Sequence, residues 1–309
     1  MRIAHERVRA QVPATSANLG PGFDSFGLAL ELRDEYELEV TTGEVEITVE
    51  GEGADDVPRG DAHLVVQSLR AALDHIGAAQ VGIRLHCTNR IPHGRGLGSS
   101  AAAVVGGIVL ARALLADPSA LDEQEMLQLA TDLEGHPDNA APALLGGVTL
   151  SYLQGGRAHA ERLRVGTGAD GSSILDPVII SPAAPVATST ARSLLPEEVP
   201  FADAAFNLSR AALFVHAIAE DPSLLLTATQ DRLHQERRQE AMPQSVALVQ
   251  MLRQEGVPAV ISGAGPTVLI PAGAPRHLVR LVRDMVDDPA QWRIARIGLS
   301  GGGARTVLL

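Results

Sequence analysis

Apolar residues recur every three to four positions in six stretches of the chain. In the stretch 61–77, Leu64, Leu69 and Leu73 fall on one stripe, and Gly77 follows as a stop signal. The stretch 101–116 differs because it is apolar on nearly every face, which indicates a buried helix. The pattern predicts helices over 61–77, 101–116, 121–134, 201–220, 241–255 and 275–287.

Alternating apolar and polar residues predict short strands between these helices. Two pairs of strands are typical of hairpins, one around Thr42-Gly43 and one around Gly155-Gly156. Two glycine turns precede strands near the end of the chain. The predicted strands cover 7–12, 26–32, 36–42, 45–51, 81–88, 147–153, 157–165, 177–180, both arms of 259–270, and the last residues of 299–309.

Mixed helices and strands indicate an α+β fold, and 309 residues allow two domains. The sequence GTGADGSS at 166–173 is the best candidate for a linker, since it is rich in turn-forming residues and lacks apolar periodicity. We therefore predict a first domain over 1–165 and a second over 166–309. The helix at 275–287, between two strands, gives the second domain a β-α-β arrangement.

The stretch 92–103 joins a glycine-rich turn to the start of the buried helix. Gly94, Gly96 and Gly98 allow positive φ and close approach to a ligand, and Ser99 or Ser100 is a natural helix cap. The free N–H groups and positive dipole end of the helix then face the same space, which favours bound phosphate. Alternatively, the glycines only shape a loop.

Two other kinds of glycine loop do not fit this stretch. A Walker loop needs a lysine after its last glycine, and the chain has no lysine. A dinucleotide fingerprint needs an acidic residue at the end of a second strand, whereas Asp117 ends a predicted helix.

Composition excludes several classes of protein. The formal net charge of −12 argues against nucleic acid or an anionic membrane as a partner. All 25 basic residues are arginine, which excludes a lysine Schiff base. Cys87, the single cysteine, allows no internal disulfide, and a buried place in a strand is its simplest interpretation. No apolar run has transmembrane length and 1–14 lacks a signal-peptide core, so we expect a cytoplasmic protein.

Three polar segments interrupt the apolar pattern. The segment 13–24, dense in turn formers and ending at Asp24, is expected to be a loop that hydrogen-bonds a small polar ligand or merely connects strands. Glu134 ends a predicted helix, where the dipole disfavours a negative charge, so its carboxylate needs a cation. The pattern then predicts a helix C-cap at His136 and a turn at Asp138-Asn139, unless these three residues form a functional site. The basic run 231–238 is usually a solvated helix face.

Three motifs together resemble those of the GHMP kinase superfamily: PATSANLGPGFDSFG near the start, PHGRGLGSSAAA in the middle and ISGAGPT near the end. The resemblance covers the whole chain. It implies a two-domain α+β fold: an N-terminal domain with a left-handed β-α-β crossover, and a C-terminal ferredoxin-like α/β sandwich.

Within the superfamily, the chain is similar to the homoserine kinase family, in the first motif, in EGHPDNAAP at 134–142, in TARSLLP at 190–196 and in GARTVLL at the end. The resemblance implies ATP-dependent phosphorylation of L-homoserine to O-phospho-L-homoserine, with ATP and Mg²⁺ as cofactors. It leaves a homodimer open.

The resemblance also implies which residues of this chain form the site, position by position along the motifs. The resemblance implies that the ATP phosphates lie on Pro92, His93, Gly94, Arg95, Gly96, Leu97, Gly98, Ser99, Ser100, Ala101 and Ala102. It assigns Mg²⁺ to Ser99 and Glu134. It surrounds homoserine with Asn18, Asp24, His136, Asp138, Asn139, Arg192 and Arg238, of which Asn18, Asp24 and Asn139 are expected to serve catalysis.

The second carboxylate contact is assigned to Arg238, with Arg237 as the alternative, because Glu236 and Arg237 stand where the family usually has proline and an aromatic residue before its last arginine. Arginines suit a bidentate grip on the amino acid carboxylate, and Asp24 suits the ammonium or the hydroxyl. Other members of the superfamily place an aspartate with a lysine near the hydroxyl. The resemblance puts Asn139 at that aspartate position, so we expect catalysis by orientation, with Asp24 the only nearby candidate base.

Three alternatives stay open. Another small-molecule kinase of the superfamily would act on shikimate, mevalonate or a sugar, but these substrates lack an ammonium for Asp24. A non-catalytic nucleotide-binding regulator would not need Ser99, Glu134 and Asn139. A metal hydrolase built on histidines would use His93, His136 and His234, yet no HxH or HExxH spacing supports it.

Overall fold

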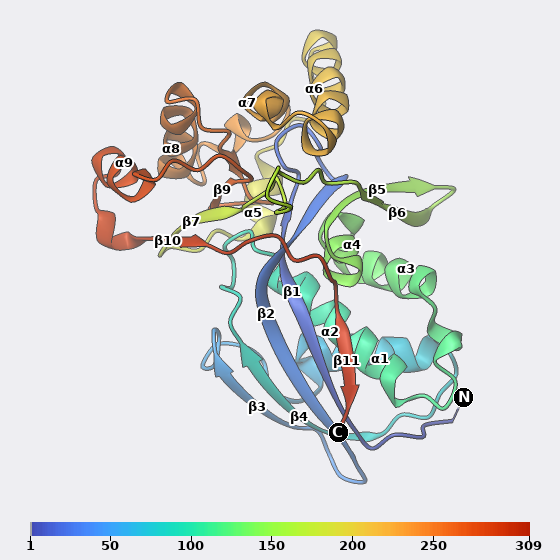
Figure 1. Ribbon diagram of the computed structural model, residues 1–309. Helices are drawn as coiled ribbons and strands as arrows, with labels where there is room; N and C mark the ends of the chain where they lie inside the picture. Colours follow the sequence, from blue (N-terminus) through green and yellow to red (C-terminus); the bar gives the residue numbers. More distant parts are fainter. Residues whose placement is uncertain (1) are drawn as a thin grey trace.

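The computed structural model describes residues 2–309, and it contains two β-sheets with helices packed on both (Figure 1). The first sheet has seven strands in the order β11-β1-β2-β4-β3, with β5 paired to β2 and β6 paired to β5. The second has four strands in the order β10-β7-β9-β8. The strands of the first sheet are β1 (Arg7–Ala17), β2 (Phe26–Thr41), β3 (Glu46–Gly51), β4 (Gly82–Asn89), β5 (Val148–Gln154), β6 (Arg157–Leu163) and β11 (Arg305–Leu308).

Four helices lie beside the first sheet and bury its apolar side chains (Figure 1). They are α1 (Leu64–His75), α2 (Ser99–Leu114), α3 (Glu123–Glu134) and α4 (Pro137–Leu145). The helix α2 is buried along most of its length, as its uniformly apolar sequence predicts. Cys87 on β4 is also fully buried, and burial raises the pKa of its thiol to about 12.

The predicted hairpin around Thr42-Gly43 is wrong. The strand β2 is continuous over Phe26–Thr41, and β4 lies between it and β3. β3 pairs with β4 in parallel, which requires a crossover, and α1 provides it. The turn signal was read correctly, but turn residues do not determine which strands pair.

The loop predicted at 13–24 is also shorter than expected. The strand β1 continues to Ala17, because the small residues Ala14, Thr15, Ser16 and Ala17 are buried against the start of β2. The remaining loop starts at Asn18, and it contacts Thr229 and Gly263 in the second half of the chain.

The second sheet has the ferredoxin-like strand order, because its strands run fourth, first, third, second in chain order and all pairs are antiparallel. The predicted glycine turn joins β8 to β9, and α9 leads from β9 to β10. The elements are β7 (Val178–Pro182), α5 (Thr188–Ser193), α6 (Phe201–Ala219), α7 (Leu225–Ala228), α8 (Pro243–Gln254), β8 (Val260–Ile261), β9 (Val268–Ile270), α9 (Leu278–Met285) and β10 (Trp292–Arg296). Of these, β10 and the short helices α5 and α7 were not predicted.

The last strand returns to the first sheet. β11 pairs antiparallel with β1, with Leu308 opposite Val8, although it follows all the strands of the second sheet. The division of the chain at 165 and 166 stays a prediction. Within residues 2–309, no helix is both long and apolar enough to cross a membrane.

Candidate active site

The glycine loop predicted to hold phosphate is held from three sides by backbone and hydroxyl groups. The backbone N–H of Thr15 on β1 donates to the carbonyl of Leu97 at 3.0 Å. The hydroxyl of Ser262, in the turn between β8 and β9, donates to the carbonyl of Gly96 at 2.6 Å. The N–H of Val186 donates to the carbonyl of Gly94 at 2.9 Å. The loop therefore lies where the two sheets meet.

Two of its glycines are required by space as well as by conformation. Gly96 has a φ of +71°, and a Cβ there would lie 2.2 Å from the carbonyl oxygen of Ser262. Gly98 has a φ of +67°, and a Cβ there would lie 1.9 Å from the Thr15 hydroxyl. Any other residue at either position would displace the loop.

The N-terminus of α2 opens onto this loop with unpaired donors. Gly98, in the left-handed conformation, is the N-cap, so the prediction of Ser99 or Ser100 as the cap is wrong. A glycine has no side chain to satisfy the first turn. Among residues 2–309, no group accepts the backbone N–H groups of Leu97, Gly98, Ser99, Ser100 or Ala101. Five free donors at the positive end of a helix form a site for an anion.

The carboxylate of Glu134 lies across from this helix start. It accepts a hydrogen bond from the Ser100 hydroxyl, with 2.5 Å between Oγ and Oε1. Burial raises the pKa of Glu134, and the Ser100 hydrogen bond and the nearby His136 partly oppose that rise. The structure thus pairs Glu134 with Ser100, while Ser99 lines the same cavity. A half-buried carboxylate beside a hydroxyl is a donor set that suits Mg²⁺.

His136, Asp138 and Asn139 are organised by a helix that the sequence did not reveal. Gly135, with φ +85°, ends α3, and His136 is the N-cap of α4, so the interpretations of His136 as a C-cap and of Asp138-Asn139 as a turn are both wrong. Pro137 at the first helical position was the signal for this helix start.

These residues form a hydrogen-bonded chain that ends on β1. His136 Nδ1 donates to the buried Asp138 carboxylate, and this interaction raises the pKa of His136. Asn139 Nδ2 donates to the same carboxylate at 3.2 Å, and its Oδ1 accepts from the Thr15 hydroxyl at 2.7 Å. The amide of Asn139 is therefore fixed in one orientation.

The loop after β1 carries Asn18 and Asp24 in strained backbone conformations. Asn18 has φ +70° and Asp24 has φ +54°, and the N–H of Asp24 donates to the Asn18 side chain at 3.0 Å. The Asp24 carboxylate accepts two hydrogen bonds from Arg192 on α5, at 2.7 and 3.2 Å. The two residues predicted to bind opposite charges of the substrate thus bind each other.

Arg238 is 2% exposed, whereas its neighbour Arg237 is exposed. It donates to the carbonyl of Gly263 at 2.8 Å, which also accepts from Asn18 Nδ2 at 2.9 Å. Burial lowers its pKa, and its buried Nε has no partner among the described residues. The interpretation of 231–238 as a solvated helix face is wrong, because His234, Gln235 and Arg238 are buried. The Asp231 carboxylate caps the turn formed by the residues after it.

All of these segments open into one cavity of about 160 Å³. The expected residues that line it are Asn18, Asp24, Gly94, Gly96, Leu97, Gly98, Ser99, Ser100, Ala101, Glu134, His136, Asp138, Asn139, Arg192 and Arg238. The lining does not include Pro92, His93, Arg95 or Ala102. The Arg95 guanidinium instead donates to the carbonyls of His93, Pro182 and Ala183.

Three lining residues were not predicted. Thr188 starts α5, and Gly263 and Ala264 lie in the turn between β8 and β9. The motif ISGAGPT contains Gly263 and Ala264, but it did not indicate which ligand they would contact. Thr188 had no signal, since α5 itself was not expected.

A second cavity of about 340 Å³ adjoins the first, and both are lined by Ser99 and Ser100. Its surface is mostly apolar, with Val57, Pro58, Leu64 and Val65 among its lining residues. A flat, weakly polar group joined to a phosphate on the glycine loop fits this arrangement. No cluster of three or more metal-ligating side chains occurs within residues 2–309, so any metal here would draw most of its ligands from elsewhere.

The chain is similar to known proteins over nearly its whole length. Residues 63–147 match the family described as GHMP kinases N terminal domain. A homoserine kinase of Streptomyces coelicolor is 51% identical over 304 residues, which cover 97% of this chain and 94% of that protein. A homoserine kinase of Streptomyces avermitilis is 49% identical, covering 98% and 93%.

Solved structures agree on the fold. The crystal structure of a homoserine kinase from Cytophaga hutchinsonii covers 99% of both chains with a TM-score of 0.84 and 24% identity. A mevalonate kinase of L. major in complex with R-mevalonate has a TM-score of 0.67 at 14% identity, covering 96% of this chain and 98% of that one. At such identities, the likeness is one of fold alone.

Proposed function

The chain belongs to the homoserine kinase family of GHMP kinases, and on that premise we propose that it transfers the γ-phosphoryl group of ATP to the primary hydroxyl of L-homoserine. The products are ADP and O-phospho-L-homoserine. The observation that carries this proposal is the shared cavity, which joins five free backbone donors at a helix start to a pocket lined by Asp24, Arg192 and Arg238. One part fits a polyphosphate, and the other fits a zwitterion with a hydroxyl.

The nucleotide phosphates are held by backbone rather than by a lysine. The free N–H groups of 97–101 and the dipole of α2 supply positive potential without any side chain. The adjoining apolar cavity takes the nucleoside, because it opens onto the same helix start. An acidic protein can bind a polyanion here because the favourable charge is local.

The Mg²⁺ that accompanies ATP fits beside Glu134 and the serine hydroxyls of Ser99 and Ser100. A bound Mg²⁺ neutralises charge on the phosphate oxygens. The carboxylate of Glu134 is half-buried at the end of α3, where a cation offsets both the burial and the helix dipole.

Homoserine is bound through both of its charges. Arg192 and Arg238 take the carboxylate, which is the planar anion that guanidinium groups bind best. When Arg192 turns to the substrate, the Asp24 carboxylate loses its partner and is free for the substrate ammonium. Substrate binding therefore exchanges an internal ion pair for two intermolecular ones.

The chain's own groups orient the acceptor hydroxyl rather than strip it of its proton. Asn139 is fixed by Thr15 and Asp138, so its amide can position the hydroxyl but cannot act as a base. Asp24, the one expected candidate base, pairs with Arg192 before the substrate binds and with the substrate ammonium afterwards. Positioning and charge neutralisation account for most of the catalysis of phosphoryl transfer, so this set of groups is sufficient.

We test the proposal by measuring ADP release with Mg·ATP and four acceptors in parallel: L-homoserine, shikimate, mevalonate and galactose. Turnover with homoserine alone, together with a product of the mass of phosphohomoserine, is the expected result. Turnover with another acceptor would leave the phosphate loop intact and contradict the pocket assignment. Nucleotide binding without turnover of any acceptor would favour the regulator.

Two further parts of the proposal concern the cell and the assembly. We propose that the enzyme acts in the cytoplasm and binds no nucleic acid and no membrane, in keeping with its acidic charge, and a homodimer is the assembly to test. Light scattering of the purified protein gives the assembly, and cell fractionation gives the compartment.

A further inference from the structure

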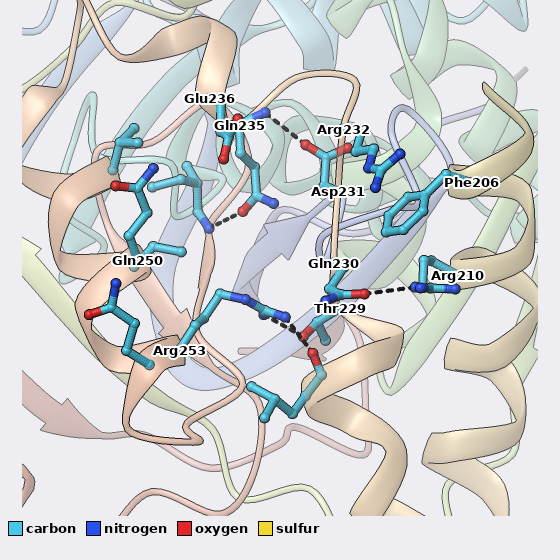
Figure 2. A pocket seen from close by; sticks show the side chains of 15 residues that line it. Phe206, Arg210, Thr229, Gln230, Asp231, Arg232, Gln235, Glu236, Gln250 and Arg253 are labelled. Atoms are coloured by element: carbon cyan, nitrogen blue, oxygen red, sulfur yellow. Dashed lines mark hydrogen bonds between the residues drawn. The ribbon is translucent and has the colours of Figure 1, made fainter. Parts of the chain in front are cut away.

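A larger cavity, of about 810 Å³, lies between α6 and α8 in the second half of the chain (Figure 2). Its third wall is the segment from Thr229 to Glu236, which passes between the two helices. None of its lining residues lines the two cavities of the active site. Its volume is within the range of small-molecule sites, and nothing in the proposed reaction uses it.

Two arginines face this cavity without an acidic partner. Arg253 on α8 donates to three neutral oxygens: the Thr229 hydroxyl at 2.9 Å, the Ala259 carbonyl at 3.1 Å and the Leu226 carbonyl. Arg210 on α6 donates to the side-chain oxygen of Gln230 at 2.9 Å (Figure 2). In the part of the chain that the structure describes, no carboxylate pairs with either guanidinium.

The acids of the cavity do not balance this charge. The Asp231 carboxylate is 1% exposed and accepts hydrogen bonds from Asn207 and from the backbone N–H groups of residues 233–235. Its charge is thus committed to its own segment. Arg232 pairs with Asp203 at 3.4 Å. Glu236 is exposed at the edge, so Arg210 and Arg253 give the interior its positive sign.

The remaining lining suits a small organic molecule. Gln230, Gln235, Gln250 and Gln254 offer amide groups around the cavity, and apolar surface comes from Leu226, Val246, Val249 and Ile261. Gln250 and Gln254 are exposed, and neither side chain is engaged in a hydrogen bond within residues 2–309. Their amides are therefore available to a ligand.

We propose that this cavity is a second binding site, which takes a small organic anion through its carboxylate or phosphate group. Arg253 and Arg210 bind the anionic group from opposite sides of the cavity. A planar guanidinium can donate two parallel hydrogen bonds to the oxygens of a carboxylate or phosphate. The glutamine amides and the apolar side chains hold the rest of the molecule. Burial lowers the pKa of Arg253, and a bound anion would relieve the cost of that burial.

The site is positioned to affect homoserine binding, an effect that rests on the proposed function. The segment 229–238 forms a wall of both sites, because it starts at Thr229 and ends at Arg238. Thr229 accepts from Arg253, and its carbonyl lies so close to Gly20 that a Cβ there would be 2.5 Å away. His234 Nε2 donates to the Gly20 carbonyl at 2.7 Å. Gly20 belongs to the loop that carries Asp24, so an anion on Arg253 alters the homoserine pocket.

Calorimetric titration tests the site directly, with inorganic phosphate and succinate as the two probes. The active site is first saturated with Mg²⁺, a non-hydrolysable ATP analogue and homoserine, so that the remaining binding reports the second cavity. The phosphate and succinate arms separate the two kinds of anion. We expect at least one to bind with a Kd of about 10 mM or tighter.

Three variants locate the binding. Arg210→Gln removes one guanidinium, and Gln250→Glu adds a negative charge at an exposed position; each should weaken binding by about tenfold. Gln244→Glu is the matched control, since Gln244 is exposed on the same helix but lies outside the cavity lining, and it should change nothing. No binding of either probe, or equal binding to all variants, would overturn the site.

The coupling has its own readout. In wild-type enzyme, the bound anion should change the homoserine KM by about threefold or more, and Arg210→Gln should remove that change. Binding with an unchanged KM would overturn the coupling. Because the titration needs no turnover, failure of the proposed reaction would not be mistaken for failure of the site.

Discussion

The two halves of the active-site cavity are built on opposite principles. The half proposed to bind phosphate is made of backbone: free N–H groups, a helix dipole and glycines that leave no room for a side chain. The half proposed to bind the amino acid is made of charged side chains that bind one another, such as Asp24 with Arg192 and His136 with Asp138. The first is ready before its ligand arrives, and the second must exchange partners.

This difference separates affinity from selectivity. A preformed backbone site binds any polyphosphate of the right shape, since it has no group that must move. A pocket of paired charges favours a ligand that offers both a carboxylate and an ammonium, because a ligand with only one leaves a charge unpaired. Variants that alter one half and leave the other intact can therefore test each half separately.

The largest effect is expected from Gly96→Ala. Its Cβ would meet the Ser262 carbonyl and must also adopt a positive φ, so the loop moves and activity falls by about a hundredfold or more. Steady-state kinetics with both substrates measure this. Gly156→Ala is the control: its φ is +82°, but nothing lies within 4 Å of its Cβ, so it should keep full activity. Equal loss in both variants would mean that backbone strain alone explains the effect.

Glu134→Gln should lower kcat/KM by about tenfold to a hundredfold and weaken the Mg²⁺ dependence. It should also raise the Tm of the ligand-free protein. Burial raises the pKa of Glu134, so its ionised form costs stability at pH above that pKa, and the amide does not. The gain in Tm should therefore shrink as pH falls. An unchanged Mg²⁺ titration would contradict the ligand assignment.

Arg192→Ala should raise the homoserine KM by about tenfold or more, because it removes a charged hydrogen-bond donor from the carboxylate. The ATP KM should change little, since Arg192 lies in the amino acid half. Arg237→Ala is the control, because Arg237 is exposed and does not line the cavity. Equal effects of Arg192→Ala on the homoserine KM and the ATP KM would contradict the assignment of Arg192 to the amino acid half.

The smallest effect concerns the His136–Asp138 pair. Folding raises the pKa of His136, chiefly through the Asp138 hydrogen bond. The stabilisation is thus complete below the unfolded pKa and is lost as pH rises through the folded pKa. Urea unfolding at several pH values should show this decline at pH above about 6.5 in wild type and a flatter curve in His136→Gln. Parallel curves for wild type and His136→Gln would exclude the His136–Asp138 pair as the source of the decline in stability.

The same contrast decides what could be predicted from the sequence. The phosphate loop is a local feature, so the glycines and the start of α2 were located from their spacing alone. The error at the N-cap arose because Gly98 and Ser99 both suit the position, and only the left-handed φ of Gly98 decides between them.

The amino acid half depends on contacts across the chain. Nothing local indicates that Arg192 meets Asp24 across 168 positions, or that Thr15 fixes Asn139. The resemblance named Asp24, Arg192 and Asn139, but it indicated neither the pairing of Asp24 with Arg192 nor the contact of Asn139 with Thr15. The false hairpin at Thr42-Gly43 has a similar origin, because strand pairing is set by the path of α1 and by packing on the sheet.

The most direct test of the central claim compares homoserine with two truncated analogues: 4-hydroxybutanoate, which lacks the ammonium, and 3-aminopropan-1-ol, which lacks the carboxylate. Each keeps the hydroxyl. The account predicts that both lose about a hundredfold or more in kcat/KM while the ATP KM is nearly constant. If either analogue reacts as well as homoserine, the paired charges of Asp24, Arg192 and Arg238 do not select the substrate, and the account is wrong.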